Sequence, residues 1–201
     1  MPQHAYQYCR GPLPVPPGKS GFGIKGDFYR HLSETIGTID KKSDGALDRI
    51  LAREGLKQFM AQAFLATSFY DNLPLARVTM AIAEVTGRDI FALTSKMGVS
   101  SAERCMTGVY QSLVGGLQAV SFHKHFPSVI KFFYNYAPLT VTPGADKKSA
   151  AVTRAGIPLD VAEWWSLVSV PFVKLPLEAN GAKDVTVDWR VAPHTSAAGA
   201  V

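Results

Sequence analysis

The stretch "PLTVTPGADKKSAAVTRAG", residues 138–156, decides the fold class, because the period of the apolar residues changes there. Before this stretch, apolar residues recur at the spacing of about 3.6 that is typical of amphipathic helices. Within it, apolar and polar residues alternate with a period of two, which indicates β-strands. The polar segment "GADKK", residues 144–148, is typical of a turn. The sequence therefore predicts a β-hairpin in this stretch.

The segment after the hairpin has the pattern of a helix. Asp160 is a capping residue at its start, and the helix is predicted from about Val161 towards Asn180. Pro171 and Pro176 lie inside it and are expected to bend or break it, since proline removes a backbone hydrogen bond.

The end of the sequence alternates again. In "VTVDWRV", residues 185–191, valines and Trp189 occupy every second position. This alternation predicts a last strand whose apolar face packs on the helix that contains Trp164 and Trp165. The order after the helical part is therefore expected to be β-β-α-β.

The segment before the hairpin is predicted to be mostly helical. Its helices are delimited by glycine, proline and capping residues, which interrupt the helical periodicity. The expected helices are Leu47 to about Tyr70, Pro74 to Gly87, Asp89 to Met97, Ser100 to about Leu113, Leu117–His125 and Pro127–Tyr136. Together with the strands, they predict an α+β fold in which the helical N-terminal two-thirds packs on a small antiparallel sheet.

Both ends of the chain look different from the part between them. Residues 1–21 contain five prolines and three glycines, which predicts a flexible arm outside the core. Residues 192–201, "APHTSAAGAV", predict a disordered tail. Residues 22–191 are expected to form a single domain.

Composition excludes several classes of function. Hydrophobic residues make up 47% of the 201 residues and charged residues 18%, which is typical of a globular protein. No apolar run reaches the length of about 18 residues that a membrane span needs. The net charge of +5 comes from scattered lysines and arginines, so no nucleic-acid partner is expected. The two cysteines, Cys9 and Cys105, lie far apart, which favours the reducing cytoplasm.

The segment "FHKHF", residues 122–126, is the only one in which two histidines lie close together. On a helix, residues two apart point roughly 200° from one another, so His123 and His125 do not share one metal ion. His123 is interpreted as a packed or half-buried helix residue, with contact to a ligand as the alternative. No metal site is predicted.

Aromatic residues gather on both sides of the predicted hairpin. "FFYNY", residues 132–136, precedes it, and "EWW", residues 163–165, follows it. Because adjacent aromatic side chains cannot all face one core, three interpretations stay open: a core seam, a pocket for an apolar ligand and a dimer surface. The residues considered for ligand binding are Tyr110, His123, Phe133, Tyr134, Tyr136, Trp164 and Trp165.

Four segments within about residues 60–191 resemble a bacterial family of unknown function that is abundant in myxobacteria. They are "FYDNLPLARVTMAIAEVTGRD", "GVYQSLVGG", "FPSVIKFFYNYAPLTVT" and "GIPLDVAEWWSLVSVPFVKLPLEANGAKDVTVDWR". That family is more distantly similar to the ligand-binding fold of heme nitric-oxide sensors, 4-vinyl-reductase domains and transport-particle subunits. The resemblance implies a helical pocket, capped by an antiparallel sheet, that holds a hydrophobic small molecule or an acyl chain. The heme sensors carry a Tyr-x-Ser-x-Arg motif that this sequence lacks, so neither heme nor another cofactor is expected.

These observations predict a binding, sensory or interaction module that recognises a hydrophobic small molecule or another protein, as a homodimer. The alternative is a cofactor-free isomerase, cyclase or hydrolase acting on an apolar substrate. In that case Tyr110, His123, Tyr134 or Tyr136 would supply the acid and base. A third possibility is a structural partner whose exposed aromatic residues form an interface. The sequence identifies neither the ligand nor a reaction.

Overall fold

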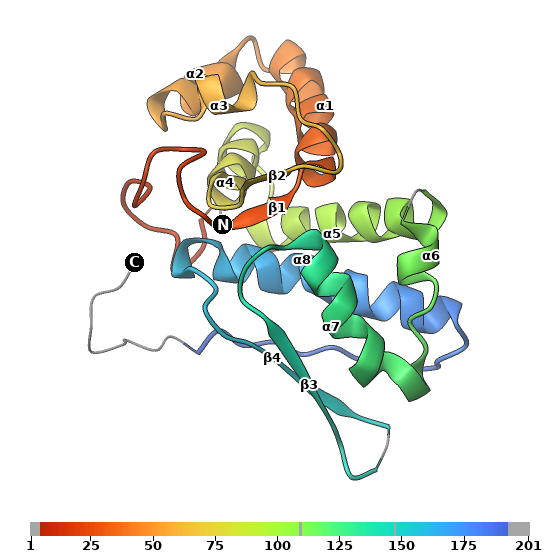
Figure 1. The fold of residues 1–201 in the computed structure, drawn as a ribbon. Helices are drawn as coiled ribbons and strands as arrows, with labels where there is room; N and C mark the ends of the chain where they lie inside the picture. Colours follow the sequence, from red (N-terminus) through yellow and green to blue (C-terminus); the bar gives the residue numbers. More distant parts are fainter. Residues whose placement is uncertain (1–4, 109, 147, 193–201) are drawn as a thin grey trace, which may run out of the picture.

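The chain folds into helices and two small antiparallel sheets, which confirms the predicted α+β class (Figure 1). The structure is a computed structural model, and it describes residues 5–108, 110–146 and 148–192. The helices are α1 (Asp27–Lys42), α2 (Ala46–Arg53), α3 (Lys57–Met60), α4 (Pro74–Thr86), α5 (Ile90–Thr107), α6 (Gln111–Val114), the 3-10 turn η1 (Ala119–Ser121), α7 (Phe122–Phe133) and α8 (Leu159–Ala179). The strands are β1 (Gly23–Lys25), β2 (Phe69–Asp71), β3 (Leu139–Pro143) and β4 (Ala150–Arg154).

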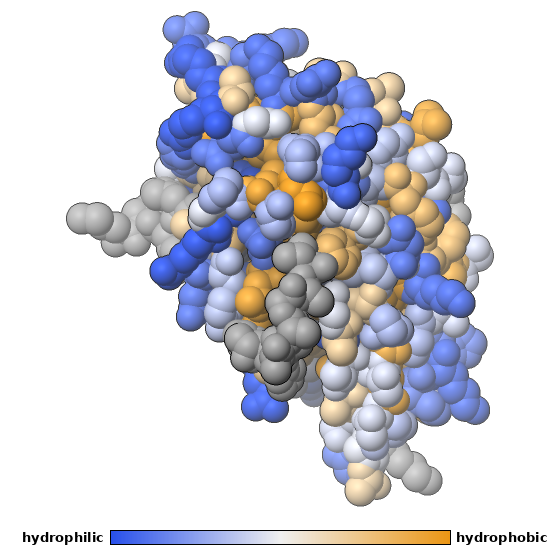
Figure 2. Space-filling view, turned by 60° about the vertical axis from the view of Figure 1, so that its left-hand side comes forward, coloured by the Kyte–Doolittle hydropathy of each residue, from blue (hydrophilic) through white to orange (hydrophobic). Residues whose placement is uncertain are grey.

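The predicted hairpin is present as β3 and β4. Its register pairs Leu139 with Arg154 and Val141 with Val152, so these four side chains share one face. The base of the hairpin packs on α7, where Leu139 is buried. The rest projects from the body in Figure 1, and in Figure 2 it forms the mostly pale extension at the lower edge. The hairpin is therefore attached to the core at one end only.

A second sheet lies where the sequence predicts a long helix from Leu47 to Tyr70. That prediction is wrong after α2, because Gly55 adopts a left-handed backbone (φ +69°) that ends the helical run. The chain then becomes extended as β2, which pairs antiparallel with β1. An isolated bridge between Ile24 and Tyr134 joins β1 to the end of α7. The sequence also did not predict α1.

The two long helices α5 and α8 form the most extensive helix contact of the described chain. The prediction that Gly98 ends a helix is wrong, because α5 continues through it. A Cβ at Gly98 would lie 2.7 Å from Cγ of Pro171 and 2.9 Å from the carbonyl oxygen of Val168. Gly98 therefore permits a close approach of α5 to α8. Pro171 and Pro176 lie inside α8 without ending it.

Two other helix boundaries differ from the predictions in the same way. The expected division at Pro127 is wrong, since α7 continues from Phe122 to Phe133 with the proline inside it. No separate helix begins at Ser100. The predicted cap Asp89 is confirmed, because its Oδ1 accepts a hydrogen bond from the backbone nitrogen of Ala92 at 2.9 Å. Packing between helices therefore overrides local start and stop signals.

The proline-rich arm belongs to the core in its described part, so the prediction for residues 1–21 is wrong over residues 5–21. Tyr6 and Cys9 are buried in the main hydrophobic cluster. The backbone nitrogen of Tyr8 donates to Oε2 of Glu163 at 2.9 Å, and that of Gly18 donates to Oδ2 of Asp71 at 2.8 Å. Backbone groups and single side chains make these contacts, so the arm shows no periodic pattern of apolar residues in its sequence. Residues 1–4 lie outside the described residues.

The last predicted strand, residues 185–191, is absent from the described chain. The segment is extended, but it has no strand partner. Val185, Val187 and Val191 are partly buried, so the alternation is real, whereas Trp189 is 39% exposed. The prediction is wrong because alternation does not supply a neighbouring strand. Of the predicted tail, residues 193–201 lie outside the described residues.

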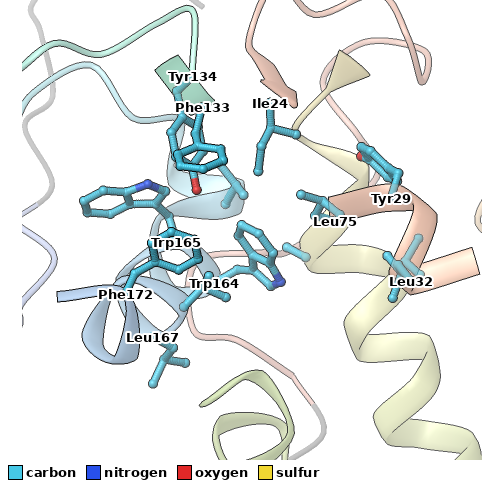
Figure 3. Close-up of a cluster of buried hydrophobic side chains, with 14 of the residues drawn as sticks. Ile24, Tyr29, Leu32, Leu75, Phe133, Tyr134, Trp164, Trp165, Leu167 and Phe172 are labelled. Carbon is cyan, nitrogen blue, oxygen red and sulfur yellow. The ribbon is translucent and has the colours of Figure 1, made fainter. Parts of the chain in front are cut away.

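The core gathers side chains from elements that lie far apart in the sequence. Figure 3 shows Ile24 from β1, Tyr29 from α1 and Leu75 from α4 beside the aromatic residues that follow and precede the hairpin. Trp164 and Phe133 are each 1% exposed. The helical part and the hairpin base therefore share one hydrophobic core.

Candidate functional site

Three of the predicted aromatic residues meet around an arginine at the base of the hairpin. Tyr134 and Tyr136 follow α7, Trp165 lies on α8 and Arg154 is the last residue of β4. Asn72, which follows β2, reaches the same place through its side chain. These five residues, Asn72, Tyr134, Tyr136, Arg154 and Trp165, are called the Arg154 cluster. The hairpin register positions it, because it places Arg154 opposite the buried Leu139.

The guanidinium of Arg154 lies against aromatic faces. Its central carbon is 4.2 Å from the ring centroid of Tyr134, 4.8 Å from that of Tyr136 and 4.6 Å from that of Trp165. Nε donates to the carbonyl oxygen of Ala137 at 2.7 Å, and Nη2 donates to that of Tyr136 at 3.0 Å. Cation–π attraction and two backbone hydrogen bonds therefore fix the orientation of the side chain.

The third nitrogen of this guanidinium has no partner. Nη1 of Arg154 is buried, and within the described chain it makes no hydrogen bond. No carboxylate of the described residues forms an ion pair with Arg154. Burial lowers the pKa of Arg154, and the nearby hydroxyls of Tyr134 and Tyr136 oppose that shift. The cluster thus holds a cation whose charge no acidic side chain of the described residues balances.

The other polar groups of the cluster are mostly neutral donors. Burial raises the pKa of Tyr136 to about 12 and that of Tyr134 further, while the positive charge of Arg154 opposes both shifts. The side-chain amide of Asn72 hydrogen bonds with the hydroxyl of Tyr136. The indole nitrogen of Trp165 faces the hydroxyl of Tyr134 in Figure 3 but is buried without an acceptor at hydrogen-bonding geometry. Oδ1 of Asn72 is a buried acceptor of the cluster without a partner.

The remaining candidate residues lie apart from this cluster. Phe133 and Trp164 are fully buried in the core. Tyr110 is buried beside Phe132 and Phe133, and its hydroxyl donates to the carbonyl oxygen of Ala66 at 3.3 Å. His123 is half-buried on α7, as expected, and within the described chain it shares no hydrogen bond or ring contact with the cluster. The seven candidates therefore do not form one site.

The space between the rings is almost filled. A void of about 10 Å³ lies on the core side of Tyr134, which is room for about one water molecule. This void is therefore too small for the apolar ligand that the sequence led us to expect. The residues around the void are Phe28, Ile130, Phe133, Tyr134, Val168, Ser169 and Phe172.

A wider depression lies between α1 and the end of α4. It has a volume of about 600 Å³, is open to solvent, and is lined by a mixture of charged, hydroxyl and aliphatic side chains. Burial and the nearby positive charge of Arg104 lower the pKa of His31, which lines this depression. None of the seven candidate residues lines it. The lining residues are His31, Glu34, Thr35, Thr38, Ile39, Lys42, Ser43, Val85, Thr86 and Arg88.

The described part of the chain contains neither a metal-binding group of side chains nor a reactive thiol. No group of three histidine, cysteine or acidic side chains there is placed to hold a metal ion. Cys9 and Cys105 are free and buried, and burial raises the pKa of each thiol to about 12. Thiols of such pKa stay protonated near neutral pH and are poor nucleophiles. Among the described helices, each is too short or too polar to cross a bilayer.

Sequence reasoning missed Arg154 and Asn72. A signal for Arg154 was present, because it shares its strand face with Ala150 and Val152, and a charged residue on an apolar strand face is unusual. The aromatic residues on both sides of the hairpin were the second half of that signal. Asn72 gave none, since its role depends on β2, which was predicted as helix.

Comparison with known proteins adds nothing to this geometry: no protein-family model, no curated protein and no solved structure matches the chain. The resemblance of residues 60–191 to the myxobacterial family therefore stays a prediction. The function is inferred below from the Arg154 cluster.

Proposed function

We propose that the protein is a binding module that holds a small hydrophobic molecule at the Arg154 cluster. The observation that supports this proposal is the gathering of three aromatic faces around one cation at the junction of α7, the hairpin and α8. Ligand sites are commonly lined by aromatic side chains together with a few fixed polar groups. Arg154 and Tyr136 keep partial exposure, so a ligand approaches past these two side chains.

The titration of the cluster favours binding over catalysis. A general acid or base works best when its pKa lies near the working pH. The tyrosine hydroxyls of the cluster have raised pKa values, and arginine stays protonated. Near neutral pH, these side chains therefore offer no proton acceptor, as a cofactor-free isomerase, cyclase or hydrolase would require.

Entry of a ligand requires movement, because the rings fill the space in this structure. The hairpin is the element best suited to move, since it packs on α7 only near its base and its outer half is exposed. An isolated two-stranded hairpin is only marginally stable in water. Elements with few buried contacts open at low free energy.

A matched pair of variants tests the proposal. The neutral probe 4-phenylbutan-1-ol is titrated into the full chain, and binding is followed by isothermal calorimetry. We expect saturable binding that Tyr136→Ala weakens by roughly tenfold, or about 1.4 kcal/mol. Tyr8→Ala is the control, because Tyr8 is also half-buried and its hydrogen bonds to Glu163 and Arg10 are made by its backbone, which the substitution keeps. Absence of binding, or equal weakening by both substitutions, would contradict the proposal.

The protein also carries a surface suited to a second copy of the chain. Leu65, Phe69 and Phe132 are 64%, 42% and 38% exposed. The Nζ atom of Lys25 lies 3.9 Å from the ring centroid of Phe69 and 5.3 Å from that of Phe132, so both rings lie on one surface. We therefore include homodimerisation through this surface in the proposal.

Sedimentation measurements test the dimer. Phe69→Glu is expected to shift the protein to monomer, because it places a charge in the apolar contact. Val152→Glu is the control, since Val152 is similarly exposed (41%) but lies on the projecting hairpin. A monomeric wild type, or dissociation caused equally by the control, would contradict this part of the proposal. The two unpaired cysteines support placing this binding module in the reducing cytoplasm.

A further inference from the structure

The charge of Arg154 is the feature of the cluster that the proposed binding of a hydrophobic molecule does not explain. Two of its three nitrogens donate to backbone carbonyls, which are neutral acceptors. Nη1 is buried without an acceptor, and no acidic side chain of the described residues pairs with the guanidinium. A buried charge is costly unless a counter-charge or hydrogen bonds compensate it. Two hydrogen bonds and the aromatic faces compensate Arg154 in part, and no counter-charge among the described side chains completes that compensation.

A second buried donor in the cluster lacks an acceptor at good geometry. Nε1 of Trp165 faces the hydroxyl of Tyr134 but is not aligned for a hydrogen bond with it, and the ring of Trp165 lies 4.6 Å from the guanidinium carbon. Buried donors in native proteins usually have partners, so two unpartnered donors in one cluster need an explanation. Oδ1 of Asn72 does not supply it, because this acceptor is neutral and bonds with neither donor.

We infer that the ligand of the Arg154 cluster carries a carboxylate, whose oxygens accept hydrogen bonds from Nη1 of Arg154 and Nε1 of Trp165. This inference rests on the proposed function and specifies its ligand as an apolar molecule with an acidic group. A carboxylate has one negative charge, which balances the single charge of Arg154, and two oxygens, which match the two free donors. The apolar body of the ligand then packs on the aromatic faces.

A comparison of headgroups on one apolar body tests the inference. The full chain is titrated with 4-phenylbutanoate and with 4-phenylbutan-1-ol, and the dissociation constants are measured by calorimetry at pH 7. We expect the acid to bind at least roughly tenfold more tightly than the alcohol, because it forms charge-assisted hydrogen bonds. Arg154→Lys is expected to bring the ratio of the two dissociation constants close to one, since a lysine ammonium does not reproduce the planar fork that bonds both carboxylate oxygens.

Two further variants make the result interpretable. Arg49→Lys is the matched control, because Arg49 is exposed on α2 and its guanidinium donates to a backbone carbonyl oxygen, that of Asp44. Trp165→Phe removes the indole donor but keeps an aromatic ring. It is expected to weaken the binding of the acid several-fold more than the binding of the alcohol. This variant decides the question if Arg154→Lys does not fold.

Each outcome has a distinct meaning. If acid and alcohol bind equally and Arg154→Lys changes neither affinity, the inference of a carboxylate is overturned. The proposed binding of a hydrophobic molecule would still stand. Failure of both probes to bind would overturn the proposed function together with the inference. Tighter binding of 4-phenylbutyl phosphate than of 4-phenylbutanoate would overturn the carboxylate in favour of a phosphate group.

Discussion

Arg77 and Arg154 are both largely removed from water, yet they are compensated in different ways. Arg77 lies on α4 and is 6% exposed, and its Nη2 bonds Oδ1 of Asp160 at 2.9 Å. Its guanidinium also donates to the carbonyl oxygens of Arg10 and Gly11 in the arm. Arg154 likewise donates to two backbone carbonyls, but aromatic rings occupy the place of the acid.

The difference separates an arginine with a counter-charge inside the described chain from the one at which we propose that a ligand binds. Each has one nitrogen without a partner, Nε in Arg77 and Nη1 in Arg154, so unpaired nitrogens alone do not distinguish them. The charge does, because Asp160 balances Arg77 within the chain whereas no described acid balances Arg154. The charge of Arg77 is therefore balanced within the described chain, and the anion that we propose for Arg154 would balance the other.

The largest effect is expected from Arg77→Met. The substitution removes the partner of a partly buried carboxylate and releases the arm from α4, so we expect the free energy of unfolding to fall by about 3 kcal/mol. Urea denaturation followed by circular dichroism measures this loss.

Arg49→Met is the control for Arg77→Met, because it removes the same charge from an exposed position. It is expected to change the free energy of unfolding by less than about 0.5 kcal/mol. A loss at Arg77 as small as that of the control would show that the ion pair with Asp160 does not hold the arm.

A smaller effect is expected from Arg154→Met. The substitution loses two hydrogen bonds and the cation–π contacts, but it also removes a buried charge without a counter-ion. These contributions oppose each other, so the free energy of unfolding is expected to fall by about 1 kcal/mol or less. Denaturation under the same conditions measures it. A loss equal to that at Arg77 would remove the distinction between the two arginines.

The elements that the sequence predicts well have a period visible in their own residues. The hairpin was predicted from its alternation, and α8 was predicted despite Pro171 and Pro176. Elements that depend on a distant partner were predicted badly. β2 exists because β1 pairs with it, and residues 185–191 form no strand because nothing pairs with them. Gly98 was read as a stop, whereas its role depends on α8.

The sequence predicted the aromatic residues of the candidate site but not its polar ones. The composition around the hairpin indicated Tyr134, Tyr136 and Trp165, and the structure brings these three together. It does not bring Tyr110 or His123 to them. Arg154, which gives the cluster its charge, was missed because the argument for aromatic residues considered apolar ligands only. The position of a single charged side chain relative to residues distant in the sequence leaves no periodic pattern from which it could be predicted.

The smallest effect is expected from Tyr136→Phe, and it appears only at high pH. Burial raises the pKa of Tyr136 from 10.0 to about 12 in the folded protein. Between these values the unfolded chain loses the phenolic proton first, so the folded state binds more protons and stability falls as pH rises. The contribution of Tyr136 is therefore fully present below pH 10 and lost as the pH rises through about 12.

We expect Tyr136→Phe to reduce the loss of unfolding free energy between pH 9 and 11 by about 1 kcal/mol or less. Denaturation at a series of pH values measures the slope. The same slope in wild type and variant would show that the hydroxyl of Tyr136 is not kept neutral by its surroundings, and would weaken the description of the cluster as a set of donors around an unbalanced cation.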